Sequence, residues 1–242
     1  MVKKTKDEIK LYFPFLEEIR KRLLFTFSVF IIVSIVSFFY FEKIVIPILK
    51  IISLPGINIV FTSPFQFIEL SLSSALVAGL VVCFPLILIQ ILSFLKPALK
   101  SAEFKTVTYL LPISAFLFIG GFVFGFFIMK YVIILFYQKS QELNIGNVLD
   151  VSRLLSQILL TSALMGIFSQ YPIVITLLLK FKVIKYQTLT SQRPFIYTAA
   201  LILASLLPPT DALSLILLTF PLVFLFEITL LLNRLILKTH LN

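Results

Sequence analysis

The run LSLSSALVAGLVVCFPLILIQILSFL, residues 70–95, is 26 residues long and carries no Asp, Glu, Lys or Arg. The hydrocarbon core of a bilayer is about 30 Å thick, so a helix needs about 20 apolar residues to cross it. A membrane-spanning β-strand instead alternates apolar and polar residues over roughly ten positions, whereas residues 80–89 are apolar throughout. This run therefore predicts a transmembrane helix.

Similar runs occur on both sides of it. In chain order the predicted spans are residues 23–41, 70–95, 107–129, 154–179, 195–207 and 212–232. The fifth run has only 13 residues, bounded by Pro194 and Pro208, and reaches about 20 Å as a helix. It does not cross a bilayer of normal thickness unaided. The expected fold class is an all-α membrane protein with six transmembrane helices, of which the fifth and sixth are short.

The third run contains a small-residue step. Gly121 and Gly125 form a GxxxG pattern, which allows two helix backbones to approach closely. We expect this packing within one subunit, with a contact between two copies as the alternative.

The composition excludes most enzyme classes. Hydrophobic residues make up 60% of the 242-residue chain and charged residues 13%, against roughly 25% charged residues in a soluble domain. One cysteine and one histidine provide no Cys/His zinc site and no catalytic triad inside the membrane. The seven glycines form no phosphate-binding loop, so ATP is not the expected energy source. We expect no enzymatic activity, no metal and no cofactor.

Lysine and arginine are distributed unevenly between the segments that separate the spans. The N-terminal segment, the second and fourth connections and the C-terminal segment hold 16 of them, against 5 in the intervening connections. Positively charged connections remain on the cytoplasmic side, so both termini are expected in the cytoplasm. The net charge of +10 then reflects topology and attraction to anionic lipid, and it does not indicate nucleic-acid binding.

Residues 1–22 form a basic segment ahead of the first span. Over residues 14–22 the apolar side chains follow one stripe, which predicts a short amphipathic helix lying at the cytoplasmic interface. The following apolar run has 19 residues and no small-residue cleavage site, so we expect it to be retained and not removed as a signal peptide. Residues 1–242 contain no internal repeat and no long linker, and a single domain is expected.

Two carboxylates lie on the expected cytoplasmic side, which is otherwise strongly basic. Glu18 has an i,i+4 neighbour in Arg22, and Glu103 lies between two lysines. These neighbours allow ordinary ion pairs worth a few tenths of a kcal/mol. A cationic ligand is the alternative, because a guanidinium binds a carboxylate through two parallel hydrogen bonds and an ammonium does not.

Three further polar residues lie within or beside the last spans. Glu227 is inside the sixth run, where a charge at mid-membrane costs about 2.5–3.5 kcal/mol, so a functional role is expected, with a protonated structural glutamate as the alternative. Gln170 in the fourth run is expected to form a hydrogen bond between helices. Asp211 follows a Pro-Pro pair and is expected to cap the sixth helix.

Four stretches of the chain match the pattern of one known family. The first two are LEEIRKRLL, residues 16–24, and Thr62-Ser63-Pro64 at the entry to the second span. The third runs from Phe94 to Glu103 and follows F-x-x-P-x-L-x-x-x-E. The fourth comprises Arg193-Pro194, the segment from Leu207 to Asp211, and Phe226-Glu227. Through these motifs the chain resembles TatC, the multispanning subunit of the twin-arginine protein translocase.

The resemblance implies a receptor for signal peptides. The TatC family recognises the paired arginines of signal peptides on folded cargo proteins. Glu18 and Glu103 match its cytoplasmic recognition carboxylates, and Arg20 and Phe94 belong to the same two motifs. The resemblance therefore implies a signal-peptide site made of these four residues.

The resemblance also implies partners and a location. The family works with single-span proteins of the TatA and TatB type, docked along the last helices, where Gln170, Asp211 and Glu227 lie. It draws on the proton gradient and uses no nucleotide. Self-association in the lipid bilayer and a multi-pass location in the bacterial inner membrane are expected.

Three positions depart from the family's pattern. Phe15 replaces the usual histidine, Gln66 stands where many members have an acidic residue, and Gln170 replaces a common intramembrane glutamate. Glutamine carries neither a proton nor a charge, so no ionisation step is expected at position 170.

Two other functions are weaker alternatives. A secondary transporter for a small solute would be expected to contain repeats with polar groups converging at the midplane, but the six runs hold only one ionisable residue of the Asp, Glu, Lys and Arg types, Glu227. An intramembrane hydrolase would need a histidine or an aspartate pair within the spans, which the runs lack.

Overall fold

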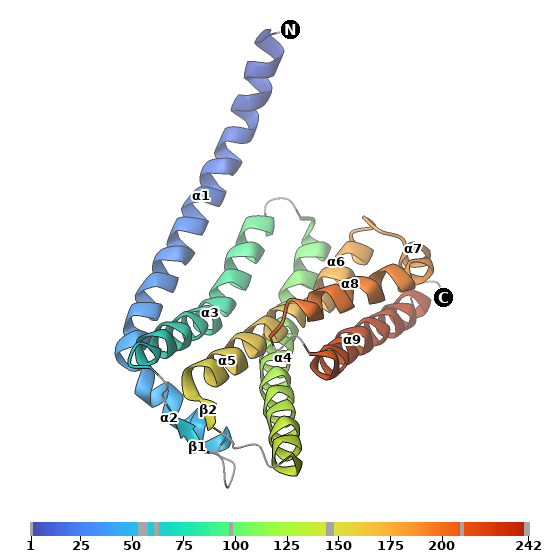
Figure 1. Cartoon of the computed structure of the whole chain (residues 1–242). Coiled ribbons are helices and arrows are strands. Elements are labelled where there is room, and N and C mark those ends of the chain that lie inside the picture. The colour runs from blue at the N-terminus through green and yellow to red at the C-terminus, as the bar shows by residue number, and fades with distance from the viewer. Residues whose placement is uncertain are drawn as a thin grey trace.

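The structure is a computed structural model that describes residues 2–52, 58–60, 63–96, 99–143, 148–208 and 211–239. Within these ranges the chain is mainly helical (Figure 1). Its elements are α1 (Val2–Phe39), α2 (Phe41–Ile52), β1 (Asn58–Val60), α3 (Gln66–Leu95), α4 (Ser101–Glu142), β2 (Val148–Asp150), α5 (Val151–Phe168), α6 (Tyr171–Lys180), α7 (Tyr186–Ser191), α8 (Arg193–Ser205) and α9 (Ala212–Thr239).

Five helical segments in the described part of the chain are long and apolar enough to cross a membrane. They are Leu16–Phe39, Gln66–Ile91, Glu103–Glu142, Val151–Lys180 and Ala212–Leu235. These segments overlap the first, second, third, fourth and sixth predicted spans, and the third continues 13 residues beyond its predicted end at Met129. The fifth predicted span coincides with α8, which is apolar but has only 13 residues. The chain is therefore a membrane protein, and its described residues include five apolar helical segments of spanning length and the shorter α8.

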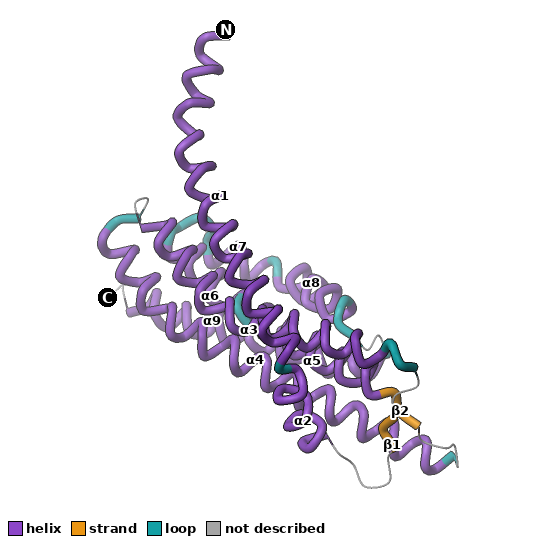
Figure 2. The backbone as a smooth tube through the Cα atoms, turned by 90° about the vertical axis from the view of Figure 1, so that its left-hand side faces the viewer, coloured by secondary structure: helices purple, strands orange, loops and turns teal. Residues whose placement is uncertain are grey.

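α1 runs without interruption from Val2 to Phe39, so the prediction of a separate short helix over residues 14–22 is wrong. At 1.5 Å per residue, 38 residues reach about 57 Å, which is almost twice the thickness of a bilayer core. No glycine or proline lies between residues 15 and 39, and an established helix gains one hydrogen bond for each residue added. The N-terminal half of α1 consequently projects beyond the other helices (Figures 1 and 2).

The sixth span is not short, and this expectation is also wrong. α9 has 28 residues and continues seven positions beyond the predicted end at Leu232. Asn233 does not stop the helix because its side-chain amide donates to the Thr229 carbonyl at 2.8 Å and to the Thr176 hydroxyl at 3.1 Å. Asn233 is buried, and its contact with α6 satisfies its polar side chain.

The fourth span is broken where α5 ends and α6 begins. Pro172, the second residue of α6, has no N–H with which to continue α5. Before the break, α5 packs very closely on α4. A Cβ atom added at Gly121 would lie 2.7 Å from the Met165 carbonyl oxygen, and one added at Gly125 would lie 3.0 Å from the Ser162 Cα. The GxxxG step therefore packs within the subunit, as expected.

A small cap lies at the opposite end of the molecule from the N-terminal half of α1. β1 and β2 pair in parallel, with Ile59 opposite Leu149, and α2 lies next to them (Figure 2). Two three-residue strands show no periodicity, so the sequence did not predict them. The C-terminal end of α3, the N-terminal end of α4 and α7 lie at the other end of the helices (Figures 1 and 2).

Candidate functional site

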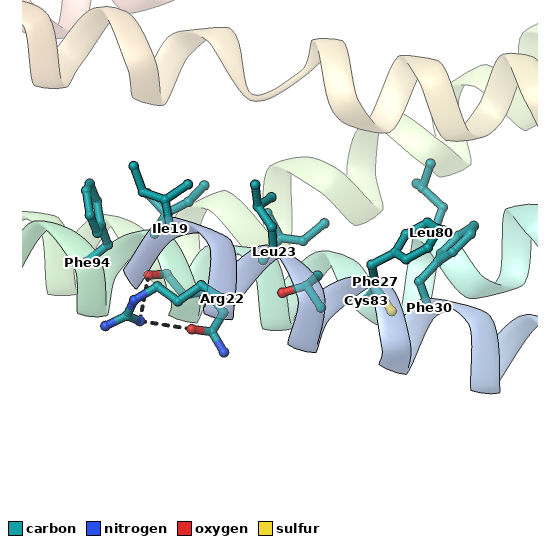
Figure 3. Close-up of a pocket in the computed structure, with 12 residues that line it drawn as sticks. Ile19, Arg22, Leu23, Phe27, Phe30, Leu80, Cys83 and Phe94 are labelled. Carbon is teal, nitrogen blue, oxygen red and sulfur yellow. Dashed lines mark hydrogen bonds between the residues drawn. The ribbon is translucent and has the colours of Figure 1, made fainter. Parts of the chain in front are cut away.

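An apolar groove runs between α1 and α3 and encloses about 530 Å³. On α1 the residues Ile19, Leu23, Phe27 and Phe30 follow one another at three- and four-residue spacing, so they share one face of the helix. Residues of α3 at similar spacing line the other wall: Leu80, Cys83, Ile87, Gln90, Ile91 and Phe94. Figure 3 shows Ile19, Arg22 and Phe94 at one end of the groove and Phe30, Leu80 and Cys83 towards the other.

Glu18 lies beside the polar end of this groove and pairs with Arg22, as its i,i+4 spacing predicts. Its Oε1 atom accepts hydrogen bonds from Arg22 Nε at 3.0 Å and from Nη2 at 2.5 Å. The third guanidinium nitrogen, Nη1, donates to Gln90 Oε1 at 2.9 Å and to the Gln90 carbonyl at 3.3 Å (Figure 3). Arg22 thus joins the carboxylate on α1 to α3.

The other three predicted signal-peptide residues occupy different positions. Phe94 is half-buried and lines the groove with Ile19 and Arg22. Arg20 is exposed and does not line the groove. It precedes Arg22 by two positions, a rotation of about 200° around the helix axis, so the two side chains lie on opposite faces of α1. Glu103 lies in the first turn of α4, where its Oε2 accepts from the Lys100 backbone N–H at 2.9 Å instead of pairing with a lysine ammonium.

The motif that links Phe94 to Glu103 is only partly covered by the structure. Pro97 and Ala98 lie outside the described residues, as does Thr62 of the second motif. Glu103 stays partly accessible, and one of its oxygens caps the helix. A carboxylate at a helix N-terminus is also favoured by the helix dipole. Glu18 and Glu103 therefore differ: one is held by a guanidinium, the other by a backbone amide.

Glu227 lies between α8 and α9 and has two partners. The Tyr197 hydroxyl donates to its Oε1 at 2.5 Å, and Arg193 Nη2 lies 3.2 Å from its Oε2. The side chains of Arg193 and Glu227 are 45% and 38% exposed, so the pair faces outward from the helical hairpin. The intramembrane charge expected from the sequence is thus compensated within the chain, while remaining accessible to a neighbouring helix.

Gln170 and Asp211 both lie where a helix begins. Gln170 precedes α6; its side-chain oxygen accepts from the Ser114 hydroxyl of α4 and its nitrogen donates to the Gly166 carbonyl at 3.2 Å. Asp211 accepts from the Ser214 backbone N–H at 2.9 Å and from its hydroxyl at 2.7 Å. Asp211 therefore caps α9, which confirms the cap predicted from the sequence, and Gln170 forms the expected hydrogen bond between helices.

Sequence reasoning missed Gln90, Arg193 and Tyr197 as members of these clusters. A signal existed for Gln90, because it is the only amide or charged side chain between residues 70 and 95. In the sequence, Arg193 stands out only through its charge and through its place in the Arg193-Pro194 motif. Its ion pair with Glu227 depends on how α8 and α9 pack and has no sequence signature.

No group of three His, Cys, Asp or Glu side chains that could hold a metal ion occurs in the described ranges.

The comparisons with known proteins point to transport. The sequence model of one family, "Sec-independent protein translocase protein (TatC)", matches residues 14–221. The chain belongs to the TatC family. This match covers most of the chain, from the middle of α1 into α9.

Relatives along nearly the whole length agree. TatCy of Bacillus subtilis (strain 168) is 28% identical over 224 residues, which are 90% of this chain and 86% of that protein. TatC of Aquifex aeolicus (strain VF5) is 31% identical over 225 residues, covering 91% and 93% of the two chains. TatC proteins are thus relatives of this chain over about nine tenths of its length.

The fold is also that of a TatC protein of known structure. The crystal structure of a "Twin Arginine Translocase Receptor" TatC superposes with a TM-score of 0.78 and 29% sequence identity, covering 91% of this chain and 98% of that one. A second crystal structure of TatC, in the detergent DDM, gives a TM-score of 0.79. These matches give no support to the solute-transporter alternative.

Proposed function

We propose that this protein is the receptor subunit of a twin-arginine translocase and binds signal peptides with paired arginines. The observation that carries the proposal is the Glu18 carboxylate at the end of an apolar groove between α1 and α3. A signal peptide has a positively charged region followed by 7–15 apolar residues, roughly the order in which the site offers a carboxylate and then an apolar wall. Glu103, Arg20 and Phe94 complete the proposed site.

The proposed topology has six spans in one domain, with both termini in the cytoplasm of a bacterial cell. The connections with most of the lysine and arginine residues belong to the same end of the molecule as α7 and the N-terminal half of α1, which supports this orientation. The groove end with Arg22 and Phe94 then faces the cytoplasm, where unexported cargo is located.

The α8–α9 hairpin is proposed to thin the membrane. α8 has 13 residues, and the Thr161 hydroxyl of α5 donates to the carbonyl of Pro208 at the tip of the hairpin. Thr161 lies in the middle of α5, ten residues after its start, so the tip stops about 15 Å short of the N-terminal end of α5. A bilayer that adapts to this short hairpin becomes thinner at a modest cost per Å.

Transport is proposed to involve single-span partners of the TatA and TatB type and a proton gradient, with no catalytic chemistry and no nucleotide. Glu227, paired with Arg193 and partly exposed on the hairpin, offers a partner helix a polar contact. Gln170 and Asp211 lie near the same hairpin and contribute through the helix ends that they stabilise. Self-association would bring several such hairpins together.

Binding of a signal peptide with Arg-Arg, compared with a Lys-Lys version, tests the proposal on the purified chain in detergent. We expect selective binding of the Arg-Arg peptide and at least about tenfold weaker binding in Glu18→Ala and Glu103→Ala, since each removes a charge-assisted hydrogen bond. Glu17→Ala is the matched control, because Glu17 is exposed and adjacent to Glu18 but points to another face of α1. Equal binding of both peptides by the wild-type chain would contradict the proposal.

A further inference from the structure

The Glu18 carboxylate is held through only one of its two oxygens. Arg22 Nε and Nη2 both donate to Oε1, and within the described residues Oε2 has no hydrogen-bond partner. The Glu18 side chain is 39% exposed and the Arg22 side chain 23%, so the carboxylate of the pair remains partly accessible. A carboxylate with one oxygen fixed and the other open still accepts a second donor.

Arg22 is itself fixed by the neighbouring helix. Its Nη1 atom donates to both the side chain and the backbone carbonyl of Gln90, 68 residues away on α3. The guanidinium therefore uses its three nitrogens on two helices. An incoming cation that displaced Arg22 from Glu18 would leave a half-buried guanidinium with Gln90 as its only partner, so displacement is unfavourable.

On the basis of the proposed function, we propose that Arg22 and Gln90 are positioning residues that make Glu18 selective for guanidinium over ammonium. Arg22 compensates most of the charge of Glu18, so the attraction of a bare point charge to the site is weak. The directional acceptor Oε2 remains, and its orientation is fixed by the chain from Gln90 through Arg22. A planar guanidinium gains from a fixed acceptor, whereas an ammonium on a flexible stem gains little.

The selectivity ratio, the affinity for an Arg-Arg signal peptide divided by that for its Lys-Lys counterpart, tests this assignment. Arg22→Lys keeps the positive charge but cannot contact Glu18 through two nitrogens and Gln90 through a third. Gln90→Ala removes the support of Arg22 without touching Glu18. We expect the ratio to fall by about tenfold in Arg22→Lys and by a smaller factor in Gln90→Ala, mainly through weaker Arg-Arg binding. Their combined effect should be less than the sum, since they form one chain of contacts.

The control is Lys21→Ala, which removes an exposed cation next to Arg22 that has no contact with Glu18. Thermal unfolding of each variant shows that it is folded, and Gln90→Ala keeps the test available if Arg22→Lys is unstable. An unchanged ratio in both variants, or tighter Arg-Arg binding when Arg22 is replaced, would overturn the assignment. If the wild-type chain itself showed no preference for the Arg-Arg peptide, the result would instead contradict the proposed function.

Discussion

Two adjacent glycines in α4 have opposite surroundings. A Cβ atom at Gly121 would lie 2.7 Å from the backbone oxygen of Met165 and would also collide with the Ser169 hydroxyl, whereas a Cβ at Gly120 would meet nothing within 4 Å. The backbone of α5 cannot move away without disturbing the fourth span. Gly121 is therefore required for the contact between α4 and α5, and Gly120 is not.

Gly121→Ala is expected to lower the free energy of unfolding by about 1–3 kcal/mol, the usual cost of overpacking a core contact. Gly120→Ala, the matched control, should leave it unchanged or raise it by up to about 1 kcal/mol, because alanine loses less backbone entropy in a helix. Thermal unfolding of the two variants in the same detergent measures the difference. Equal stability of the two proteins would show that α4 and α5 do not approach as closely as described.

The two carboxylates of the proposed signal-peptide site, Glu18 and Glu103, differ in how well their partners could be predicted from the sequence. The i,i+4 spacing of Glu18 and Arg22 correctly predicted their ion pair. The neighbouring lysines likewise predicted an ion pair between Glu103 and a lysine ammonium. Instead, a Glu103 oxygen accepts a hydrogen bond from the Lys100 backbone N–H. The first turn of a helix has unsatisfied N–H groups that compete for such a carboxylate, and an exposed lysine offers little in return.

At the scale of elements, the α8–α9 hairpin combines a short helix with a long one. α8 has 13 residues and α9 has 28, and Arg193 at the start of α8 pairs with Glu227, so α9 continues 12 residues beyond the position that pairs with the start of α8. At the tip, Leu207 and Ala204 are buried, and the Pro208 carbonyl accepts a hydrogen bond from the Thr161 hydroxyl. The position of the tip along α5 is thus fixed by its packing on that helix.

Lengthening this hairpin tests its effect on the membrane. Four leucines inserted after Ser205 and four after Leu213 would extend both helices by about 6 Å. We expect transport of a folded cargo into membrane vesicles to fall several-fold, because a longer hairpin reduces the mismatch with the bilayer and so thins it less. Binding of the Arg-Arg peptide should stay unchanged, because the hairpin is far from the groove. Ser205→Leu, which adds apolar surface without length, is the control. Unchanged transport, or loss of transport and binding together, would refute membrane thinning by the hairpin.

At the scale of the whole molecule, the candidate recognition and docking sites are on different helices. The groove belongs to α1 and α3, whereas Glu227 and Arg193 belong to α9 and α8. Figure 1 shows α4, α5 and α6 between these two pairs of helices. The two functions should consequently respond to different substitutions.

Glu227→Gln is expected to weaken partner docking without changing signal-peptide binding. The amide keeps a hydrogen-bond acceptor for Tyr197 but removes the charge that pairs with Arg193, and the cost in stability is small because both side chains are partly exposed. Co-purification of TatA- and TatB-type partners should fall about fivefold while Arg-Arg peptide affinity is unchanged. Thr198→Ala, an exposed change on the same hairpin, serves as control. Retention of the partners in Glu227→Gln would exclude Glu227 as a docking residue.

The amino-acid sequence by itself determined where the long spans lie and how α9 is capped. A run of about 20 apolar residues has only one satisfactory backbone in a bilayer, and a cap such as Asp211 depends on residues three positions away. Tertiary structure decided what depends on distant partners. Gln90 fixes Arg22 across 68 residues, Thr176 allows α9 to pass Asn233, and packing on α5 fixes the position of the hairpin tip along that helix. Such contacts arise only when helices meet, because their free energy comes from groups that are far apart in the chain.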